Sequence, residues 1–145
     1  MKTPDSTPKA RLSRRVYFSS AHQYYQPQWS EQKNQEIYGD LYSPHGMGHN
    51  FALEAYVEGA IDPVTGMIIN MADFDQILKE AVKPLDHRFL NKDVPYFFNT
   101  VPTLENIAVY CFERISESLK PTSLQLLKVR VYEGDDVWVD YGADL

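Results

Sequence analysis

The stretch His49-Asn50-Phe51-Ala52-Leu53-Glu54-Ala55-Tyr56-Val57-Glu58 alternates between two kinds of side chain, and its apolar set has one parity: Phe51, Leu53, Ala55 and Val57. Successive side chains of a strand point to opposite faces, so this alternation predicts a strand with one covered face and one half-exposed face. Residues 15–22 show the same period, and one parity there is shared by Val16, Phe18, Ser20 and His22. His22 is therefore expected at the end of a strand.

Turn residues and helical spacings predict the elements that follow. Residues 62–66 have the composition of a turn, and the apolar run Met67-Ile68-Ile69 predicts a strand that forms a hairpin with residues 49–58. Apolar residues at helical spacing predict two helices, capped by Asp73 and Thr103. Pro84 and Pro121 end them, and two further strands are expected over residues 124–133 and 137–141.

Strands grouped in hairpins and helices grouped together predict an α+β domain, in which helices cover one face of an antiparallel sheet. The strand parities indicate that the opposite face is apolar too, and assembly with other copies would cover it. The segment between residues 23 and 48 is polar and aromatic, with glycine and proline, and is predicted to be a long loop or a loop with a short helix.

The composition indicates one domain with no nucleic-acid or membrane partner. A chain of 145 residues with 43% hydrophobic content can build one core, expected over residues 11–145 after a flexible tail at 1–10. A net charge of −6 argues against nucleic acid, which usually requires a basic face. No run approaches the roughly 18 apolar residues of a membrane span, so we expect a cytoplasmic protein. Cys111, the single cysteine, lies on a helix stripe and is expected to be inert core.

Four histidines suggest a metal site, because all of them fall at strand ends or in loops bounded by glycine and proline: His22, His45, His49 and His87. Alternate residues of an extended chain face the same way, so Met47 and His49, with His45 if the chain stays extended, can face one point. His22 is the candidate for a third ligand that leaves one position open. The alternative is that these are ordinary surface histidines.

Two acidic positions also have a functional and a structural interpretation. Asp86 can orient the imidazole of His87 for proton transfer, or it can cap a turn beside a solvated histidine. Glu133 shares the parity of the apolar residues of its strand, so its carboxylate should point to the covered face, where paired N–H groups of a ligand could bind it. Alternatively, it is a strand-end acid in solvent.

Seven ordered blocks lie between Tyr17 and Gly142: Phe18-Ser19-Ser20-Ala21-His22, Gly48-His49-Asn50-Phe51, Val57-Glu58-Gly59, Ile61-Asp62-Pro63 with Thr65-Gly66-Met67, Leu85-Asp86-His87 with Leu90-Asn91, Pro102-Thr103 with Glu105-Asn106, and Val131-Tyr132-Glu133. Together they resemble the 6-pyruvoyltetrahydropterin synthase family, which includes the 6-carboxytetrahydropterin synthases of queuosine biosynthesis. The resemblance implies a tunnelling fold: an antiparallel four-stranded sheet with two helices on one face, with the sheets of several subunits closing into a barrel. It also implies a homohexamer built from two trimers, with active sites between subunits.

The resemblance further implies Zn²⁺, bound by the residue that matches His22 and by a His-Gly-His element whose second histidine matches His49. It implies proton relay by Asp86 and His87, and a pterin site that includes Glu133, Thr103 and Glu105. These residues are all present in the chain: Thr103, Glu105, Asp86, His87 and Glu133.

Two positions depart from the family pattern. Met47 stands where the first histidine of His-Gly-His would be, and a thioether is a soft, weak ligand for zinc. The ligand set His22, His45 and His49 is therefore our hypothesis. Leu41 stands at the position of the catalytic cysteine and cannot exchange a proton; three nearby residues are open as substitutes: Glu36, Asp40 and Tyr42.

Three functions are compatible with this pattern. The first is a metal-dependent lyase that acts on dihydroneopterin triphosphate or a close relative, as in tetrahydrobiopterin or queuosine biosynthesis. The second is a pterin-binding protein without turnover, because the thiol is missing. The third is a related metal-dependent reaction on a changed substrate.

Overall fold

The computed structural model of the chain describes residues 7–145, which form an α+β domain around a five-stranded sheet of order β3-β1-β2-β4-β5. The strands are β1 Lys9–His22, β2 Met47–Ala60, β3 Arg88–Phe89, β4 Gln125–Glu133 and β5 Val137–Gly142. The central pairs are antiparallel, and β3 pairs parallel to β1 through Ser20 and Ala21. The expected count of four strands is therefore wrong by one short strand at the β1 edge.

Strands β1 and β2 form the backbone of the fold, with an uninterrupted register from Lys9 opposite Ala60 to His22 opposite Met47. The predicted parities are confirmed, because one face of each strand is buried: Val16, Phe18, Ser20 and His22 on β1, and Phe51, Leu53, Ala55 and Val57 on β2. Directly opposed residues share a face of the sheet. The apolar faces of both strands therefore belong to one core.

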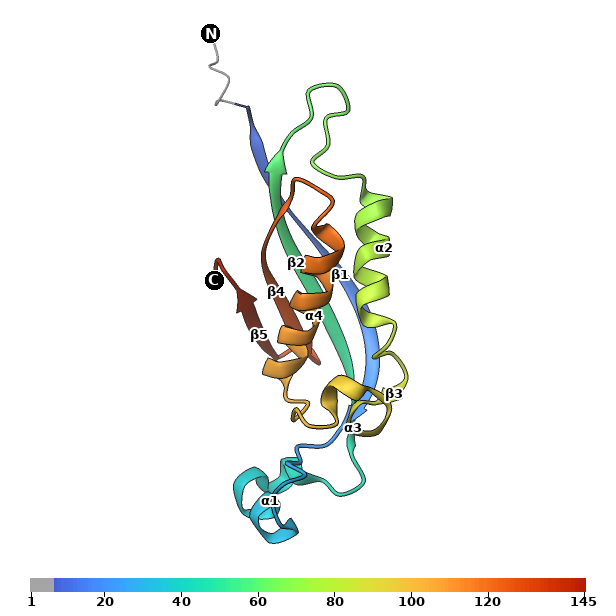
Figure 1. Ribbon diagram of the computed structural model, residues 1–145, viewed down its shortest axis with the longest axis vertical. Helices are drawn as coiled ribbons and strands as arrows, with labels where there is room; N and C mark the ends of the chain where they lie inside the picture. Colours follow the sequence, from blue (N-terminus) through green and yellow to red (C-terminus); the bar gives the residue numbers. More distant parts are fainter. Residues whose placement is uncertain (1–6) are drawn as a thin grey trace.

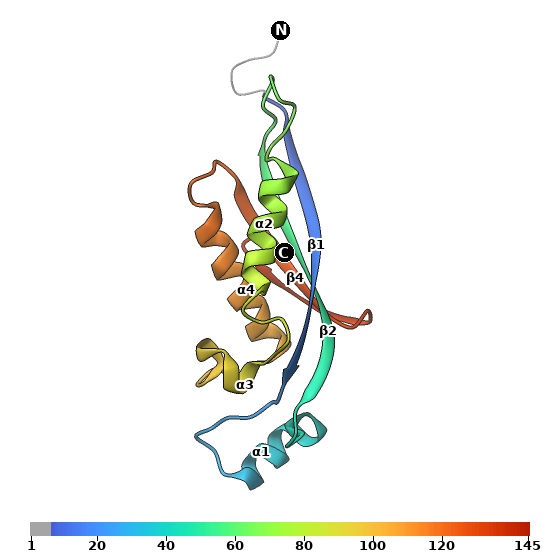
Figure 2. The ribbon, with the colours of Figure 1, turned by 90° about the vertical axis from the view of Figure 1, so that its right-hand side faces the viewer.

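Helices cover that core on one side of the sheet. The helices of the described chain are α1 Glu31–Tyr38, α2 Met71–Val82, α3 Leu90–Asp93 and α4 Leu104–Leu119, with the 3-10 turns η2 Gly39–Tyr42 and η3 Pro95–Phe97, and of these α2 and α4 form most of the cover. Figure 1 shows α2 and α4 running along the sheet, and Figure 2 shows that both lie on the same face and leave the other free of helices. Within the described range, no helix combines the length and apolar character needed to cross a membrane.

The cap of α4 agrees with the prediction, and that of α2 does not. Thr103 accepts a hydrogen bond from the Asn106 backbone N–H and caps α4, and the predicted apolar stripe of α4 is buried. Helix α2 begins three residues earlier than expected, because the side chain of Asn70 rather than Asp73 accepts from the Ala72 N–H. The earlier start lets the first turn use Asp73 near the positive end of the helix dipole.

The predicted strand over residues 67–69 is not formed. Asp62 accepts from the backbone N–H groups of Val64 and Thr65, which confirms the turn, but the chain then bends towards Asn70 and the start of α2. Ile68 and Ile69 pack against the core as loop residues. The edges of β2 are already filled by the longer strands β1 and β4, so no hairpin with residues 67–69 is possible.

The N-terminal boundary also differs from the expectation. Strand β1 begins at Lys9, so the last two residues of the stretch 1–10, for which a flexible tail was expected, are part of the sheet. Residues 1–6 of that stretch lie outside the described part of the chain.

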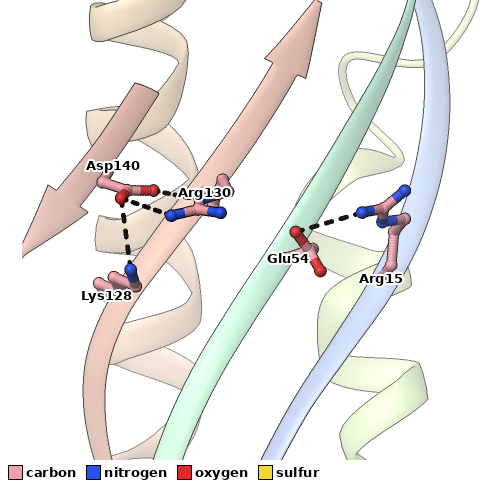
Figure 3. Close-up of polar contacts among 5 residues, drawn as sticks. All are labelled: Arg15, Glu54, Lys128, Arg130 and Asp140. Carbon is pink, nitrogen blue, oxygen red and sulfur yellow. Dashed lines mark hydrogen bonds and ion pairs between the residues drawn. The ribbon is translucent and has the colours of Figure 1, made fainter. Parts of the chain in front are cut away.

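The open face of the sheet carries charges and aromatic rings, so the expectation of an apolar second face is wrong. The register places four residues in one row across the strands, with alternating charge: Arg15, Glu54, Arg130 and Asp140. Arg130 binds Asp140 through two hydrogen bonds of 2.6 and 2.9 Å, and Arg15 lies 3.4 Å from Glu54 (Figure 3). The guanidinium of Arg15 also stacks over the ring of Tyr132.

The segment between β1 and β2 contains the expected short helix. Both ribbon views show α1 beyond the end of the sheet where β1 ends and β2 begins (Figures 1 and 2). Ser30 caps α1, and the amide of Asn34, fully buried, bonds the backbone of Gln26 and Ser30. Tyr24 donates its backbone N–H to the Leu41 carbonyl, and this bond holds η2 next to the residues that follow β1.

Candidate metal centre and adjoining cleft

Three adjacent strands bring His22, His49 and Glu133 together at one end of the sheet. His22 ends β1, His49 is near the start of β2, and Glu133 ends β4, opposite Phe51. All three have the parity of the buried face, so they point towards the core side. One ligand atom from each lies within 4.8 Å of the other two. The predicted proximity of His22 and His49 is confirmed by this cluster, as is the inward direction of Glu133.

His22 is held as a neutral imidazole with a free lone pair. Its side chain is fully buried, and Nδ1 lies 2.7 Å from the carbonyl oxygen of Pro102. A carbonyl oxygen only accepts, so Nδ1 carries the hydrogen and Nε2 keeps its lone pair. Burial lowers the pKa of His22 below its ordinary value, which favours the neutral ring. Nε2 has no hydrogen-bond partner among the described residues.

His49 presents a second buried nitrogen to the same point. Its Nε2 lies 2.9 Å from Glu133 Oε1, which is close enough for an ion pair. The angles at this contact do not satisfy a hydrogen bond, so Nε2 also counts as a buried atom without a partner in the described chain. We interpret the short distance as proximity imposed by the register of β2 and β4. The rings of His22 and His49 are 5.2 Å apart, edge to face.

These residues fit a divalent cation. Buried polar atoms normally have a partner, and two unpaired imidazole nitrogens beside a carboxylate are the usual exception when a metal binds. The hydrogen bond from His22 Nδ1 to a carbonyl is the outer contact that orients a metal-binding histidine.

His45, the third predicted ligand, lies outside this cluster. It is exposed in a turn closed by a hydrogen bond from the Gly46 N–H to the Ser43 carbonyl, and the Ser43 hydroxyl also donates to the Gly46 carbonyl. Gly46 packs against the ring of Phe89, where an added Cβ would come within 3.0 Å. The turn is therefore closed by its own bonds, and a ligand role for His45 stays a prediction.

Asp86 and His87 lie along the edge of β1 that faces away from β2. Asp86 Oδ1 accepts from the Ser19 backbone N–H at 2.9 Å, and its Oδ2 is 3.5 Å from His87 Nε2. His87 has a φ of 59° and donates its backbone N–H to the Ser19 carbonyl at 2.6 Å. Its imidazole is mostly exposed. The adjacency of the carboxylate and the imidazole is as predicted. Their catalytic role is not tested by this geometry.

A cleft of about 570 Å³ is lined by one residue of each group, His49 and His87. Ser19 and Asn50 line it too, joined by a 2.7 Å hydrogen bond, and Arg88 adds a positive charge.

The remaining predicted residues are placed around α4 and η2. The Thr103 hydroxyl oxygen is engaged as the cap of α4, and Glu105 is exposed in the first turn of the helix. Leu41 is 44% exposed on η2. Among the substitutes for the missing cysteine, Tyr42 is buried and Glu36 accepts from Gln32, while Asp40 is exposed.

Tyr24 is a site residue that the sequence analysis missed. Its ring centroid is 5.6 Å from that of His22, and its hydroxyl accepts from the Leu104 N–H at 3.4 Å. Burial raises the pKa of the Tyr24 phenol, and the nearby charges of Glu105 and Glu133 act in the same direction. The signal was available, because Tyr24 continues the parity of His22 by one further step.

Comparison with known proteins gives consistent matches over nearly the whole chain. Residues 11–144 match the protein family described as 6-pyruvoyl tetrahydropterin synthase. The human 6-pyruvoyl tetrahydrobiopterin synthase is 42% identical over 134 residues, which cover 92% of this chain and 91% of the human protein. The dihydroneopterin monophosphate aldolase of Pyrococcus furiosus is 33% identical over 132 residues, 91% of this chain and 96% of that protein. A solved structure of Caenorhabditis elegans 6-pyruvoyl tetrahydropterin synthase has a TM-score of 0.87 at 30% identity, covering 94% of this chain and 96% of that one.

Proposed function

Because the chain belongs to the 6-pyruvoyl tetrahydropterin synthase family, we propose that it is a metal-dependent lyase acting on a pterin with a hydroxylated, phosphorylated side chain. Dihydroneopterin triphosphate or a close relative is the proposed substrate. One observation carries this proposal: two buried imidazole nitrogens without partners, on His22 and His49, beside a carboxylate and next to a cleft. Such an arrangement has little value for stability alone, since unpaired buried polar atoms cost free energy.

The proposed metal is Zn²⁺, held by His22 and His49 with one further ligand. When bound, it would polarise the oxygens of the pterin side chain as a Lewis acid. Both side chains are held in place before any ligand arrives, because the core packs around His22 and the β1–β2 register positions His49. Preorganised ligands of this kind leave little to rearrange on binding.

Proton transfer is proposed for His87, with Asp86 as its orienting carboxylate. Asp86 is fixed by the Ser19 backbone, and it faces His87 Nε2, so a proton on Nε2 is stabilised and Nδ1 is the atom left to exchange a proton with substrate. The imidazole lies at the mouth of the same cleft as His49. This arrangement supports acid–base work on a side chain that reaches both residues.

Recognition of the pterin ring is proposed for Glu133, Glu105 and Thr103. Carboxylates accept pairs of N–H groups from the edge of a heterocycle. Glu105 is exposed at the N-terminus of α4, and the Thr103 hydroxyl still has its hydrogen to donate, since its oxygen accepts from Asn106. Tyr24 is close enough to Glu105 and Glu133 for both charges to raise its pKa, and its ring offers an aromatic surface beside His22.

Pterin binding without turnover is the second candidate, and Leu41 is the observation that favours it. A leucine side chain on η2 cannot replace the acid–base chemistry of a thiol. A third candidate is a different reaction on the same scaffold, and the name of the Pyrococcus furiosus relative, an aldolase, is consistent with it. Which pathway uses the product, and the cytoplasmic location, stay predictions.

A homo-oligomer is proposed as the working form, with a hexamer of two trimers and a barrel of joined sheets as its architecture. The charge row supports edge-to-edge contact between copies, because Arg15 lies on β1 where that strand has only β2 as a partner, and Asp140 lies on the edge strand β5. The two residues at the ends of this row, Arg15 and Asp140, have opposite charges, and each is also paired within the sheet. Light scattering of the purified protein would measure the assembly directly.

The deciding experiment is incubation of the purified protein with dihydroneopterin triphosphate and zinc, followed by chromatography and mass spectrometry of the products. We expect the protein to eliminate the phosphates of the substrate. The variant His49→Ala should lack this activity, and the surface variant Glu117→Gln should keep it. Measurable pterin binding without turnover would support the second candidate, and gain of activity in Leu41→Cys would then identify the missing thiol as the cause. If the protein neither binds the pterin nor converts it, both candidate functions are refuted.

A further inference from the structure

The family's three-histidine zinc site cannot be formed in this chain as it stands, because Met47 occupies one of the three positions. Met47 lies directly opposite His22 in the β1–β2 register and shares the parity of His49, so its thioether is on the face where an imidazole is expected. A thioether is a weak ligand for zinc. The nearest histidine along the chain, His45, is exposed and held in its own turn.

We propose that the carboxylate of Glu133 completes the metal site, which makes it a two-histidine, one-carboxylate centre formed by His22 Nε2, His49 Nε2 and Glu133 Oε1. This inference rests on the proposed function only in assuming that a divalent cation binds. One ligand atom from each residue already lies within 4.8 Å of the other two, and Glu133 Oε1 is 2.9 Å from His49 Nε2. Small shifts of the Glu133 side chain would bring all three to one ion.

The burial of the three groups supports a site built for a cation. His22 is fully buried, and its Nε2 has no hydrogen-bond partner among the described residues, while His49 and Glu133 have side chains that are 27% and 20% exposed. One closed side and one partly open side are what a catalytic zinc requires, since three protein ligands hold the ion and a fourth position stays accessible. His49 is the most exposed of the three side chains, and it is also one of the residues that line the cleft.

The charge of the ligands also matches. Two neutral imidazoles and one carboxylate leave a bound divalent ion with a single net positive charge, which is less costly to bury than two. Only Oε1 is directed at His49, so Oε2 of the same carboxylate remains to accept one N–H of a pterin ring. Glu105, exposed at the start of α4, is then the acid with both oxygens available.

Zinc affinity, measured without substrate by competition with a chromogenic chelator, tests this assignment. Glu133→Gln keeps the size of the side chain and removes the charge, and we expect it to weaken zinc binding by more than about 10-fold, the smallest loss typical even of outer contacts to a metal site. The matched controls Met47→Leu and His45→Ala should bind zinc within about 2-fold of the unmodified chain.

A rescue variant separates loss of a ligand from loss of structure. In the double variant Glu133→Gln with Met47→His, a third imidazole returns opposite His22, and zinc affinity should recover. X-ray absorption at the zinc edge provides a second readout, because nitrogen and oxygen ligands lie at about 2.0–2.2 Å and a thiolate-type sulfur at about 2.3 Å. The unmodified chain should show only the shorter shell.

Three results would overturn the assignment: Glu133→Gln with unchanged zinc affinity, a loss in Met47→Leu as large as that in Glu133→Gln with sulfur in the zinc shell, or no zinc binding. These outcomes are distinct from failure of the proposed function. Zinc bound through Glu133 without any pterin turnover would refute the lyase and leave the metal site standing. If the Glu133→Gln variant binds zinc normally and still converts the pterin, the metal assignment is refuted and the lyase proposal stands.

Discussion

Asp140→Asn is expected to lower the free energy of unfolding by about 1–2 kcal/mol. Asp140 accepts two hydrogen bonds from Arg130 and a third contact from Lys128 at 3.3 Å, and its side chain is only 23% exposed. A hydrogen bond to a charged group contributes about 1.5–3 kcal/mol when buried, and partial exposure reduces that value. Asparagine keeps the size and one acceptor oxygen, but it leaves Arg130 and Lys128 without their counter-ion.

The pH dependence of this difference is a stricter test. The hydrogen bonds from Arg130 hold the pKa of Asp140 below its ordinary value, so the unfolded chain takes up the proton first as the pH falls. The stabilisation is therefore present above the unfolded pKa of about 3.9 and is lost as the pH falls through the folded-state pKa. The gap between the two proteins should shrink between pH 5 and pH 3.

Urea unfolding followed by circular dichroism measures the difference, with both proteins at the same concentration because unfolding of an assembly depends on it. Glu117→Gln is the control, because the pair that it breaks with Lys120 is exposed on both sides, and such pairs contribute little. A loss below about 0.5 kcal/mol in Asp140→Asn, or a gap that persists undiminished at pH 3, would show that the ion pair is not a stabilising unit.

Three further experiments test the core, a cap and the lone thiol. Leu53→Ala should cost about 2–5 kcal/mol in urea unfolding, because Leu53 is fully buried and the sheet cannot close around the cavity. Thr103→Ala should cost about 1 kcal/mol through loss of the α4 cap, and Thr103→Ser should restore it. Burial raises the pKa of Cys111 to about 12, so a thiol reagent should label the native protein only on unfolding; rapid labelling under native conditions would contradict this.

Local patterns predicted the central elements well. The alternation in residues 49–58 identified the buried face of β2, and Thr103 identified the start of α4, because both signals depend on residues that are neighbours in the chain. Residues 67–69 misled, since three apolar residues fit a strand or a packed loop equally well. Only the pairing of β2 with β1 and β4 excludes the strand.

The candidate site was predicted in part. His22 and His49 were both predicted as metal ligands, while Glu133 was predicted to bind the pterin ring. The sequence could not show that Glu133 Oε1 lies beside His49. The two residues are 84 positions apart in the chain and are brought together only by the β2–β4 register. Nor could it show that His45 is held in a closed turn, because that depends on bonds around Ser43 and Gly46.

The sequence by itself determined the family, the alternation of the long strands and the residue types available for chemistry, because these properties are written in neighbouring positions and ordered blocks. The tertiary structure decided which atoms meet: an open face that is ionic instead of apolar, and a cluster in which a carboxylate stands closer to the two imidazoles than any third histidine does. The physical reason is that contacts across a sheet depend on register, and register is set by the packing of whole strands.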